Sequence, residues 1–400
     1  MKTIRLLPAM LLIALAACGG GDGADAAATV RDSAGIRIVE NRGGRWEEGK
    51  GWGLSAEPAL QIGVAEGDPL YQMDRVRAAL RMGDGRIVVA NGGGHQVRWY
   101  DAGGRHVASA GRQGAGPGEF QALFALRRLP GDTVLAYDLQ AFRLSWFDGG
   151  GRFVRAAPLA PVGVVPPRFV DRFADGSLLL SVSQRSFAAE PTTGISRDTL
   201  LWLRADPRGV PVDSLPPTPA GEAFFDVQRS GGRVQSFSIL TLPFMRDVHS
   251  AAAGDRYWQG TTDTYQIVLR RADGTPERIV RRAVEPVPVR GAYLDSLRRV
   301  RTAEYGAESG RELDRIDVPE RLPAFERLLV DDGGNLWVQR TAWPGAVQTE
   351  WDVFDAEGAM LGTVRMPAGF RATHVGADFV LGVWTDEDDV EYVRMYGLAK

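Results

Sequence analysis

The sequence predicts an all-β protein built from repeated units, and three observations lead to this expectation. Part of the chain returns at a shift of 47 residues, so that Trp99-Tyr100-Asp101 reappears as Trp146-Phe147-Asp148. Short runs of β-branched and aromatic residues follow Gly/Asp turns along most of the chain, which is a signal for strands. One turn pattern, Asp-x-x-Gly, recurs at Asp101, Asp148, Asp206 and Asp355. Together these features are typical of a repeat architecture made of sheets.

Two kinds of turn divide the chain into units. The first kind precedes an apolar run and lies at Asp84-Gly85, Gly131-Asp132, Asp175-Gly176, Gly254-Asp255, Gly333-Gly334 and Gly376-Ala377-Asp378. The second is the Asp-x-x-Gly turn, which begins at Asp101, Asp148, Asp206 and Asp355. Its aspartate is expected to cap the turn, and its glycine to adopt a positive φ. A repeat near this length with short strands is typical of a β-propeller blade, so we predict a six-bladed β-propeller.

The units are longer than such blades need, so insertions are expected. Polar or Pro/Gly-rich insertions are visible at residues 184–200 and 211–240. A short helical insertion is expected at about residues 290–316, where Tyr293 and Leu297 recur at helical spacing. A seventh, degenerate blade within residues 211–245 is the alternative interpretation of that stretch.

The two ends of the chain are predicted to meet in one blade. The last unit has apolar runs at residues 375–386 and 390–398 but no outer strand. Residues 59–63 have a strand pattern, belong to no unit of their own, and align with residues 107–111 one repeat later. We therefore expect this N-terminal strand to complete the last blade, which hides sheet edges that would otherwise favour aggregation.

A ten-residue loop carries a family resemblance. Residues 111–120 read Gly-Arg-Gln-Gly-Ala-Gly-Pro-Gly-Glu-Phe, which resembles the G-x-x-G-x-G-P-G-E-F connection of NHL-type six-bladed propellers. The resemblance implies that this loop joins the outer strand of one blade to the inner strand of the next. Further residues resemble bacterial six-bladed propeller lipoproteins of unassigned function: Trp46, Pro243-Phe244, Asn335-Leu336-Trp337-Val338 and Asp386-Glu387 with Val390-Glu391.

The N-terminus resembles a lipoprotein signal. After a basic start, residues 6–17 form an apolar run that is too short to span a bilayer as a helix. The run ends in Ala16-Ala17-Cys18-Gly19, which resembles a lipobox. This resemblance implies cleavage before Cys18, diacylation of its thiol and, because Gly19 is not aspartate, anchoring at the outer membrane. An ordinary secretory signal with a chance cysteine is the alternative.

Three segments are therefore predicted. Residues 1–17 are a lipoprotein signal peptide, residues 18–34 are a flexible tether, and residues 35–400 are the propeller. The tether is expected because its Gly, Ala and Asp residues cannot bury much apolar surface. Cys18 is the only cysteine, so neither an internal disulfide nor a thiolate catalyst in the folded domain is available.

The charge composition argues against a polyanion-binding surface. The formal net charge is −3, so no nucleic-acid partner is expected. Of the 47 basic residues, all but Lys2, Lys50 and Lys400 are arginine. Planar guanidinium groups suit phosphate or carboxylate recognition. The favoured interpretation is nonetheless that a GC-rich genome has scattered arginines over solvated strands.

No catalytic or metal-binding motif emerges from the sequence. G-x-S-x-G and HExxH strings are absent, and we predict no catalytic residues, no metal and no cofactor. His249 and His374 each lie close to a predicted first strand, so they are binding candidates if those ends meet around the central channel. Structural imidazoles are the favoured alternative. Asn91 aligns with Asp138, which suggests a repeated turn role.

These observations predict a lipid-anchored protein of the bacterial cell envelope that acts as a binding or interaction scaffold. Its partners would be the membrane, through Cys18, and a protein, peptide or glycan ligand on one propeller face. One alternative is a cation-assisted hydrolase or lyase with its site in the channel, and another is a purely structural envelope protein. A channel lined by one Glu and several Asp or Asn would favour the enzyme, whereas an arginine-lined channel would not.

Overall fold

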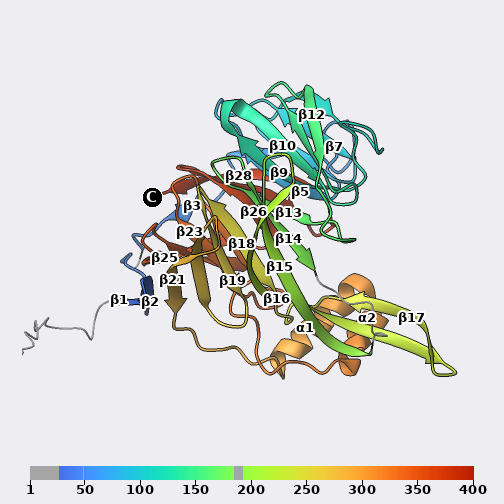
Figure 1. Ribbon diagram of the computed structural model, residues 1–400, viewed down its shortest axis with the longest axis vertical. Coiled ribbons are helices and arrows are strands. Elements are labelled where there is room, and N and C mark those ends of the chain that lie inside the picture. The colour runs from blue at the N-terminus through green and yellow to red at the C-terminus, as the bar shows by residue number, and fades with distance from the viewer. Residues whose placement is uncertain (1–26, 48, 184–191) are drawn as a thin grey trace, which may run out of the picture.

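The computed structural model describes residues 27–47, 49–183 and 192–400 (Figure 1). Six β-sheets account for the strands of these residues. The predicted signal peptide and the lipidation candidate Cys18 lie outside the described residues. No helix of the described part of the chain is both long enough and apolar enough to span a membrane.

The first three sheets follow one another along the chain. The first contains β5 (Val76–Arg81), β6 (Ile87–Asn91), β7 (Gln96–Tyr100) and β8 (His106–Ala110). The second contains β9 (Leu123–Leu129), β10 (Thr133–Asp138), β11 (Arg143–Phe147) and β12 (Phe153–Pro158), with the 3-10 turn η1 (Pro130–Asp132) between its first two strands. The third contains β13 (Arg168–Arg172), β14 (Leu178–Ser183), β15 (Gly194–Ala205), β16 (Pro211–Ser230) and β17 (Arg233–Leu240).

The other three sheets use strands from both ends of the chain. The fourth contains β18 (Val248–Ala253), β19 (Arg256–Thr261), β20 (Gln266–Arg271) and β21 (Pro276–Arg282), extended by β2 (Ile36–Asn41) and β1 (Ala28–Ser33). The fifth contains β22 (Arg327–Val330), β23 (Leu336–Gln339), β24 (Gln348–Phe354) and β25 (Met360–Pro367). The sixth contains β26 (Phe370–Val375), β27 (Phe379–Thr385) and β28 (Glu391–Ala399), with β3 (Gly53–Leu54) and β4 (Leu60–Ile62) paired to β28.

One edge strand of each sheet lies next to the corresponding strand of a neighbouring sheet. These six strands, called the inner strands below, are β5, β9, β13, β18, β22 and β26. Between β9 and β13 the link is a side-chain contact, in which Arg127 Nε lies 2.5 Å from Asp171 Oδ1. The inner strands thus line a shared axis, and the other strands of each sheet extend outward from it (Figure 1).

The hydrophobic core lies between the sheets. Six buried clusters each combine residues of two sheets. One of them joins Leu381 of the sixth sheet to Val89 of the first. Both faces of each sheet are therefore covered, which explains why β6 and β10 are almost continuously apolar. The chain has a mostly β, propeller-type arrangement.

The Asp-x-x-Gly turns have the predicted geometry. In the first copy, Asp101 Oδ1 accepts hydrogen bonds from the backbone N–H groups of Gly103 and Arg105 at 3.1 and 2.8 Å. Gly104 adopts φ +84°, a conformation that L-residues other than glycine seldom adopt. Asp148, Asp206 and Asp355 make the equivalent bonds. The backbone hydrogen bond from Arg105 is the main reason that the pKa of Asp101 is lowered.

The loop at residues 111–120 connects β8 to β9, as its resemblance implied. Glu119 closes the loop on itself, because its carboxylate accepts hydrogen bonds from Gly116 N–H at 2.8 Å and from Arg112 Nε at 2.7 Å. Phe120 is fully buried between the first and second sheets. The glycines of this loop are therefore part of a tight structural turn between β8 and β9.

The N-terminal strands add to two sheets. β4 pairs antiparallel with β28, so the pairing expected for residues 59–63 is present. β2 pairs parallel with β21, and β1 pairs with β2. β1 thus forms within the segment for which a flexible tether was predicted, residues 18–34. Its backbone is paired although its side chains are mostly exposed, so composition alone did not reveal it.

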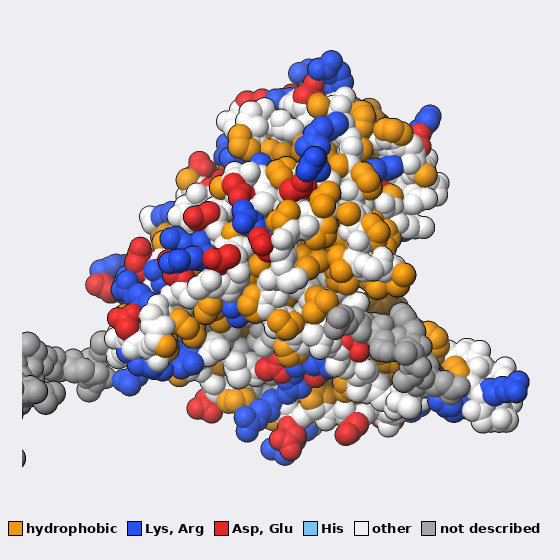
Figure 2. Space-filling view, viewed as in Figure 1, with side chains coloured by type: hydrophobic (Ala, Val, Ile, Leu, Met, Phe, Trp, Pro, Cys, Tyr) orange, Lys and Arg blue, Asp and Glu red, His pale blue; other side chains and the backbone are white. Residues whose placement is uncertain are grey.

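The third sheet corrects the interpretation of residues 211–245. β16 pairs with β15 on one side and with β17 on the other, so this stretch extends an existing sheet and forms no additional one. Their hairpin projects far beyond the sheets in Figure 1, and Figure 2 shows basic side chains at its tip. The long strands arise because β15 starts well before it meets β14, at Gly194.

The helices lie beside the base of this hairpin. α1 (Ala292–Tyr305), α2 (Ala307–Arg311) and the 3-10 turn η2 (Glu312–Arg315) fall within the range considered for a helical insertion. Tyr293 and Leu297 of α1 are buried in one cluster with Phe224 of β16 and Phe244. We call this unit, formed by the β16–β17 hairpin and residues 286–325, the accessory unit.

Candidate functional site at the start of the inner strands

The first residues of the inner strands gather at one end of the shared axis. Each sheet repeats the same antiparallel order, so every inner strand begins at the same end. We call the first or second residues of these strands the axial ring: Arg77, Phe124, Arg168, His249, Arg327 and Arg371. Four of its six members are arginine. The axial ring is therefore basic. Its positive charge disfavours the binding of a divalent cation at this end of the axis.

Two guanidinium groups of the ring, those of Arg327 and Arg371, bind the backbone of a neighbouring strand. Arg371 Nη1 donates to the carbonyl oxygen of Arg77 at 3.0 Å, and its Nη2 donates to that of Val76. Arg327 Nη2 donates to the carbonyl oxygen of Ala372 at 3.4 Å. These bonds link β22 to β26 and β26 to β5. They hold the side chains at the axis without neutralising their charges.

Burial and like charges act together on two of the arginines. Burial, followed by the positive charge of Arg371, lowers the pKa of Arg327 to about 10. Burial also lowers the pKa of Arg371, with Arg77 adding to the effect and the carboxylate of Glu391 opposing it. With a pKa of about 10, Arg327 remains protonated near neutral pH. The fold therefore places positively charged arginine side chains close together in the ring, although they repel one another.

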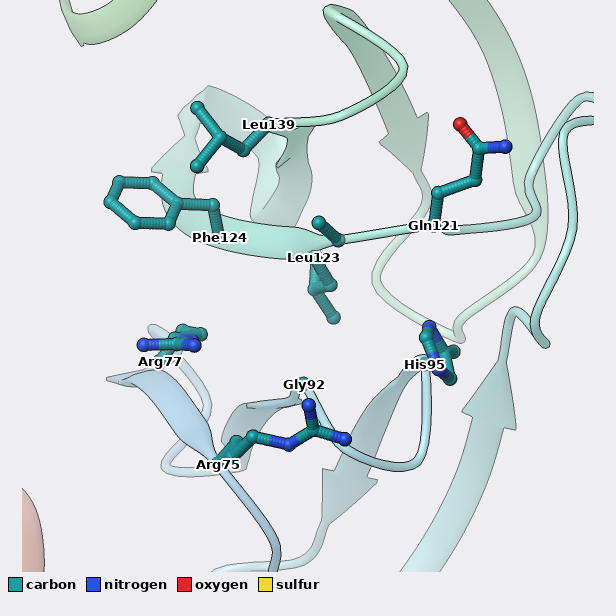
Figure 3. Close-up of a pocket in the computed structure, with 9 residues that line it drawn as sticks. Arg75, Arg77, Gly92, His95, Gln121, Leu123, Phe124 and Leu139 are labelled. Atoms are coloured by element: carbon teal, nitrogen blue, oxygen red, sulfur yellow. The ribbon is translucent and has the colours of Figure 1, made fainter. Parts of the chain in front are cut away.

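A cavity of about 140 Å³ lies between the first and second sheets at this end (Figure 3). Arg75, Arg77 and His95 contribute polar groups from the first sheet and its loops. Gln121 and Phe124 lie on the opposite wall, which belongs to the second sheet. Figure 3 shows that guanidinium groups form one side of the cavity and that apolar side chains cover much of the other.

His249 and His374 have separate surroundings. His249 is the second residue of β18 and packs against Phe325, with ring centroids 6.1 Å apart. Burial lowers its pKa, while Asp247 opposes and Arg327 assists that effect. His374 lies near the other end of its strand, β26, where Nδ1 accepts the Arg81 N–H at 3.0 Å. Because inner strands start at the same end, the two imidazoles lie toward opposite ends of the axis.

Asn91 and Asp138 have the repeated role that their alignment suggested. Asn91 Oδ1 accepts the Asp74 N–H at 2.9 Å, and Asp138 accepts the N–H groups of Gln121 and Ala122. Both side chains thus fix the chain just before an inner strand. Within residues 27–47, 49–183 and 192–400, no group of three or more His, Cys, Asp or Glu residues is arranged to hold a metal ion.

The sequence interpretation missed the arginines of the ring and the cavity residue Arg75. Their signal was positional: Arg77, Arg327 and Arg371 each stand at the beginning of an inner strand. Aligning the strand starts of all six units would have revealed the pattern. It was overlooked because arginine is common throughout the chain.

Comparisons with known proteins add little beyond the fold. No model of a known protein family matches the chain, and no curated protein matches it. A protein from Bacteroides fragilis proposed to be exported is 11% identical, with a TM-score of 0.48, over 90% of this chain and 99% of that one. A DUF4221 member from Bacteroides vulgatus is 12% identical, with a TM-score of 0.48, over 88% and 99%.

An enzyme structure shows a comparable likeness. The PQQ-bound aldose sugar dehydrogenase from Streptomyces coelicolor is 12% identical, with a TM-score of 0.44, over 86% of this chain and 98% of that one. At this level of similarity, nothing about activity transfers from one protein to another.

Proposed function

We propose that this protein is a lipid-anchored, extracytoplasmic six-bladed β-propeller that binds a ligand at the start of its inner strands. In this proposal each sheet is one blade, and β4 closes the ring by completing the last blade. The arrangement of buried clusters supports the ring, because each sheet shares a cluster with the next and the sixth shares one with the first. The lipobox resemblance at Cys18 supports the anchor.

One observation carries the choice of this end. The features that a bare propeller does not need gather where the inner strands begin. They include the cavity beside Arg77 and the accessory unit, whose helices precede β22 in the chain. The loop between β23 and β24 contacts the accessory unit, because Trp343 Nε1 lies 3.3 Å from Ser296 Oγ of α1. Loops that extend from a rigid scaffold commonly carry binding functions.

The two alternatives have less support. A cation-assisted hydrolase or lyase needs convergent carboxylates, but the axial ring is dominated by arginine. A purely structural envelope protein requires neither a cavity nor an elaborated end. A binding scaffold for a protein, peptide or glycan accounts for both features.

Site-specific crosslinking in the native envelope tests which end binds. A photoreactive residue at Gln121, which is exposed in the cavity wall, should give a discrete crosslinked product. The matched control replaces Arg152, which is 85% exposed in its side chain and lies at the opposite end. Equal products from both positions, or products from Arg152 alone, would contradict the proposal.

A further inference from the structure

The inner strands carry a large excess of positive charge. Their arginines are Arg77, Arg81, Arg127, Arg128, Arg168, Arg172, Arg327 and Arg371, and their one carboxylate is Asp171. Two of these arginines form ion pairs: Arg127 with Asp171 at 2.5 Å, and Arg81 with Asp378 at 3.5 Å. In the part of the chain that the structure describes, the other six have no ion pair.

The carboxylates of Glu391 and Glu326 act on the ring arginines Arg371 and Arg327, but both also accept other hydrogen bonds. Beside the cavity, Asp74 Oδ1 lies 3.5 Å from Arg75 Nε. Glu391 Oε2 accepts the backbone N–H of Val76 at 2.7 Å. Glu326 accepts hydrogen bonds from Gln339 Nε2 at 2.7 Å and from the Ala342 N–H at 2.8 Å. Burial raises the pKa of Glu326, so its negative charge is itself disfavoured. The positive charge at the ring is therefore only partly compensated within the chain.

The cavity supplies further donors next to this charge. Arg77 belongs both to the ring and to the cavity wall, where Arg75, His95 and Gln121 accompany it. Nδ1 of His95 is buried and has no hydrogen-bond partner among the described residues. The volume of about 140 Å³ is smaller than the ~300–1,000 Å³ of typical ligand pockets, so it suits one charged group of a ligand.

We propose that the axial ring and the adjoining cavity bind the oxyanion group, a carboxylate or a phosphate, of a small anionic ligand. This inference rests on the proposed function, because it assigns a ligand class to the same end of the propeller. Arginine suits this role because its planar guanidinium donates two parallel hydrogen bonds to one carboxylate or phosphate. Burial at the axis strengthens such contacts, since the local dielectric is lower than that of water.

Isothermal titration calorimetry of the purified protein at low ionic strength tests the inference. Citrate and pyrophosphate serve as probes, and the neutral polyol sorbitol serves as the uncharged control. At least one anion should bind, sorbitol should not, and added salt should weaken the binding. Selective binding of one anion would identify the oxyanion type.

Substitutions locate the site. Arg77→Gln should weaken binding about tenfold, which corresponds to the loss of one hydrogen bond to a charged group. This side chain is exposed, so folding should be preserved. Arg327→Gln should weaken binding to a similar extent, and its melting temperature without ligand checks that it folds. Arg152→Gln removes the same charge at the opposite end and should leave binding unchanged.

Three results would overturn the inference. The first is the absence of binding by both anions at millimolar concentration. The second is binding that Arg77→Gln leaves intact, and the third is an equal loss in Arg77→Gln and Arg152→Gln, which would indicate a general charge effect. Crosslinking through Gln121 remains an independent measurement, so a site that takes an uncharged ligand would still satisfy the proposed function.

Discussion

At the scale of single residues, a buried aspartate joins the fourth and fifth sheets. Asp352 is fully buried, and its carboxylate accepts hydrogen bonds from Tyr265 Oη at 2.7 Å and from Arg340 Nε at 3.0 Å. Arg282, at the end of β21, also contacts it. Burial, followed by the charge of Asp352, raises the pKa of Tyr265 well above its ordinary value. The phenol therefore stays protonated and remains a donor.

Removing this carboxylate should be costly. Asp352→Ala leaves Arg282 and Tyr265 without their buried partner, and we expect a loss of about 3–5 kcal/mol in the free energy of unfolding. Glu350→Ala is the matched control, because Glu350 binds Arg340 from the same strand but its side chain is 34% exposed. Its cost should be about 1 kcal/mol or less. Denaturant unfolding of both variants measures the difference, and equal costs would contradict it.

Residue-level predictions from the sequence succeeded where the chemistry is local. The cap by Asp101 and the positive φ of Gly104 depend on four consecutive residues, so a short pattern was sufficient. By contrast, Asp352 has partners from another sheet, such as Tyr265 and Arg282, and no pattern in the sequence around Asp352 predicts these partners. The same holds for Arg371, whose contacts with β5 span 294 and 295 positions of the chain.

At the scale of elements, β4 shows how a short strand can matter. Ile62 is 2% exposed and belongs to the cluster between the sixth and first sheets. Its neighbour Gln61 faces the other way, is exposed and accepts a hydrogen bond from Arg394 Nε at 2.7 Å. This alternation is the period of two that a strand imposes on its side chains.

The two faces of β4 should respond differently to truncation. Ile62→Ala should lower the free energy of unfolding by about 2–5 kcal/mol, because it removes buried methylenes and leaves a cavity. Gln61→Ala should cost about 1 kcal/mol or less, since its hydrogen bond is exposed to water. Thermal unfolding followed by circular dichroism compares them. A larger effect at Gln61 would argue against the pairing of β4 with β28.

The elements that the sequence did not reveal are those whose partners are distant. The parallel pairing of β2 with β21 brings together segments such as Val39 and Val280. The sequence of neither segment predicts this pairing. A strand pattern indicates which face of the strand is apolar, but not which strand lies beside it. In the accessory unit, a helix was expected at about residues 290–316, where α1 lies, but residues 211–240 were interpreted only as an insertion and form a long hairpin that packs against α1.

At the scale of the whole molecule, the proposed lipid anchor at Cys18 would determine where the protein acts. We predict that the protein sediments with membranes and that Cys18→Ser releases it or leaves it uncleaved, because two acyl chains are needed for stable anchoring. Membrane fractionation with an antibody against the propeller measures the distribution. Asp22→Asn, close to Cys18 but outside the lipobox, should behave as the wild type. Unchanged retention of cleaved Cys18→Ser protein would contradict lipidation.

The sequence by itself determined the repeated sheets, their turns, the β8–β9 connection and the strand that pairs with β28. Each of these follows from local turn chemistry or from the period of two along a strand. Only the tertiary structure decided that arginines from separate sheets, among them Arg77, Arg327 and Arg371, gather around one axis beside a cavity. The reason is geometric: six similar sheets bring their strand starts to one end, so residues far apart in sequence become neighbours there.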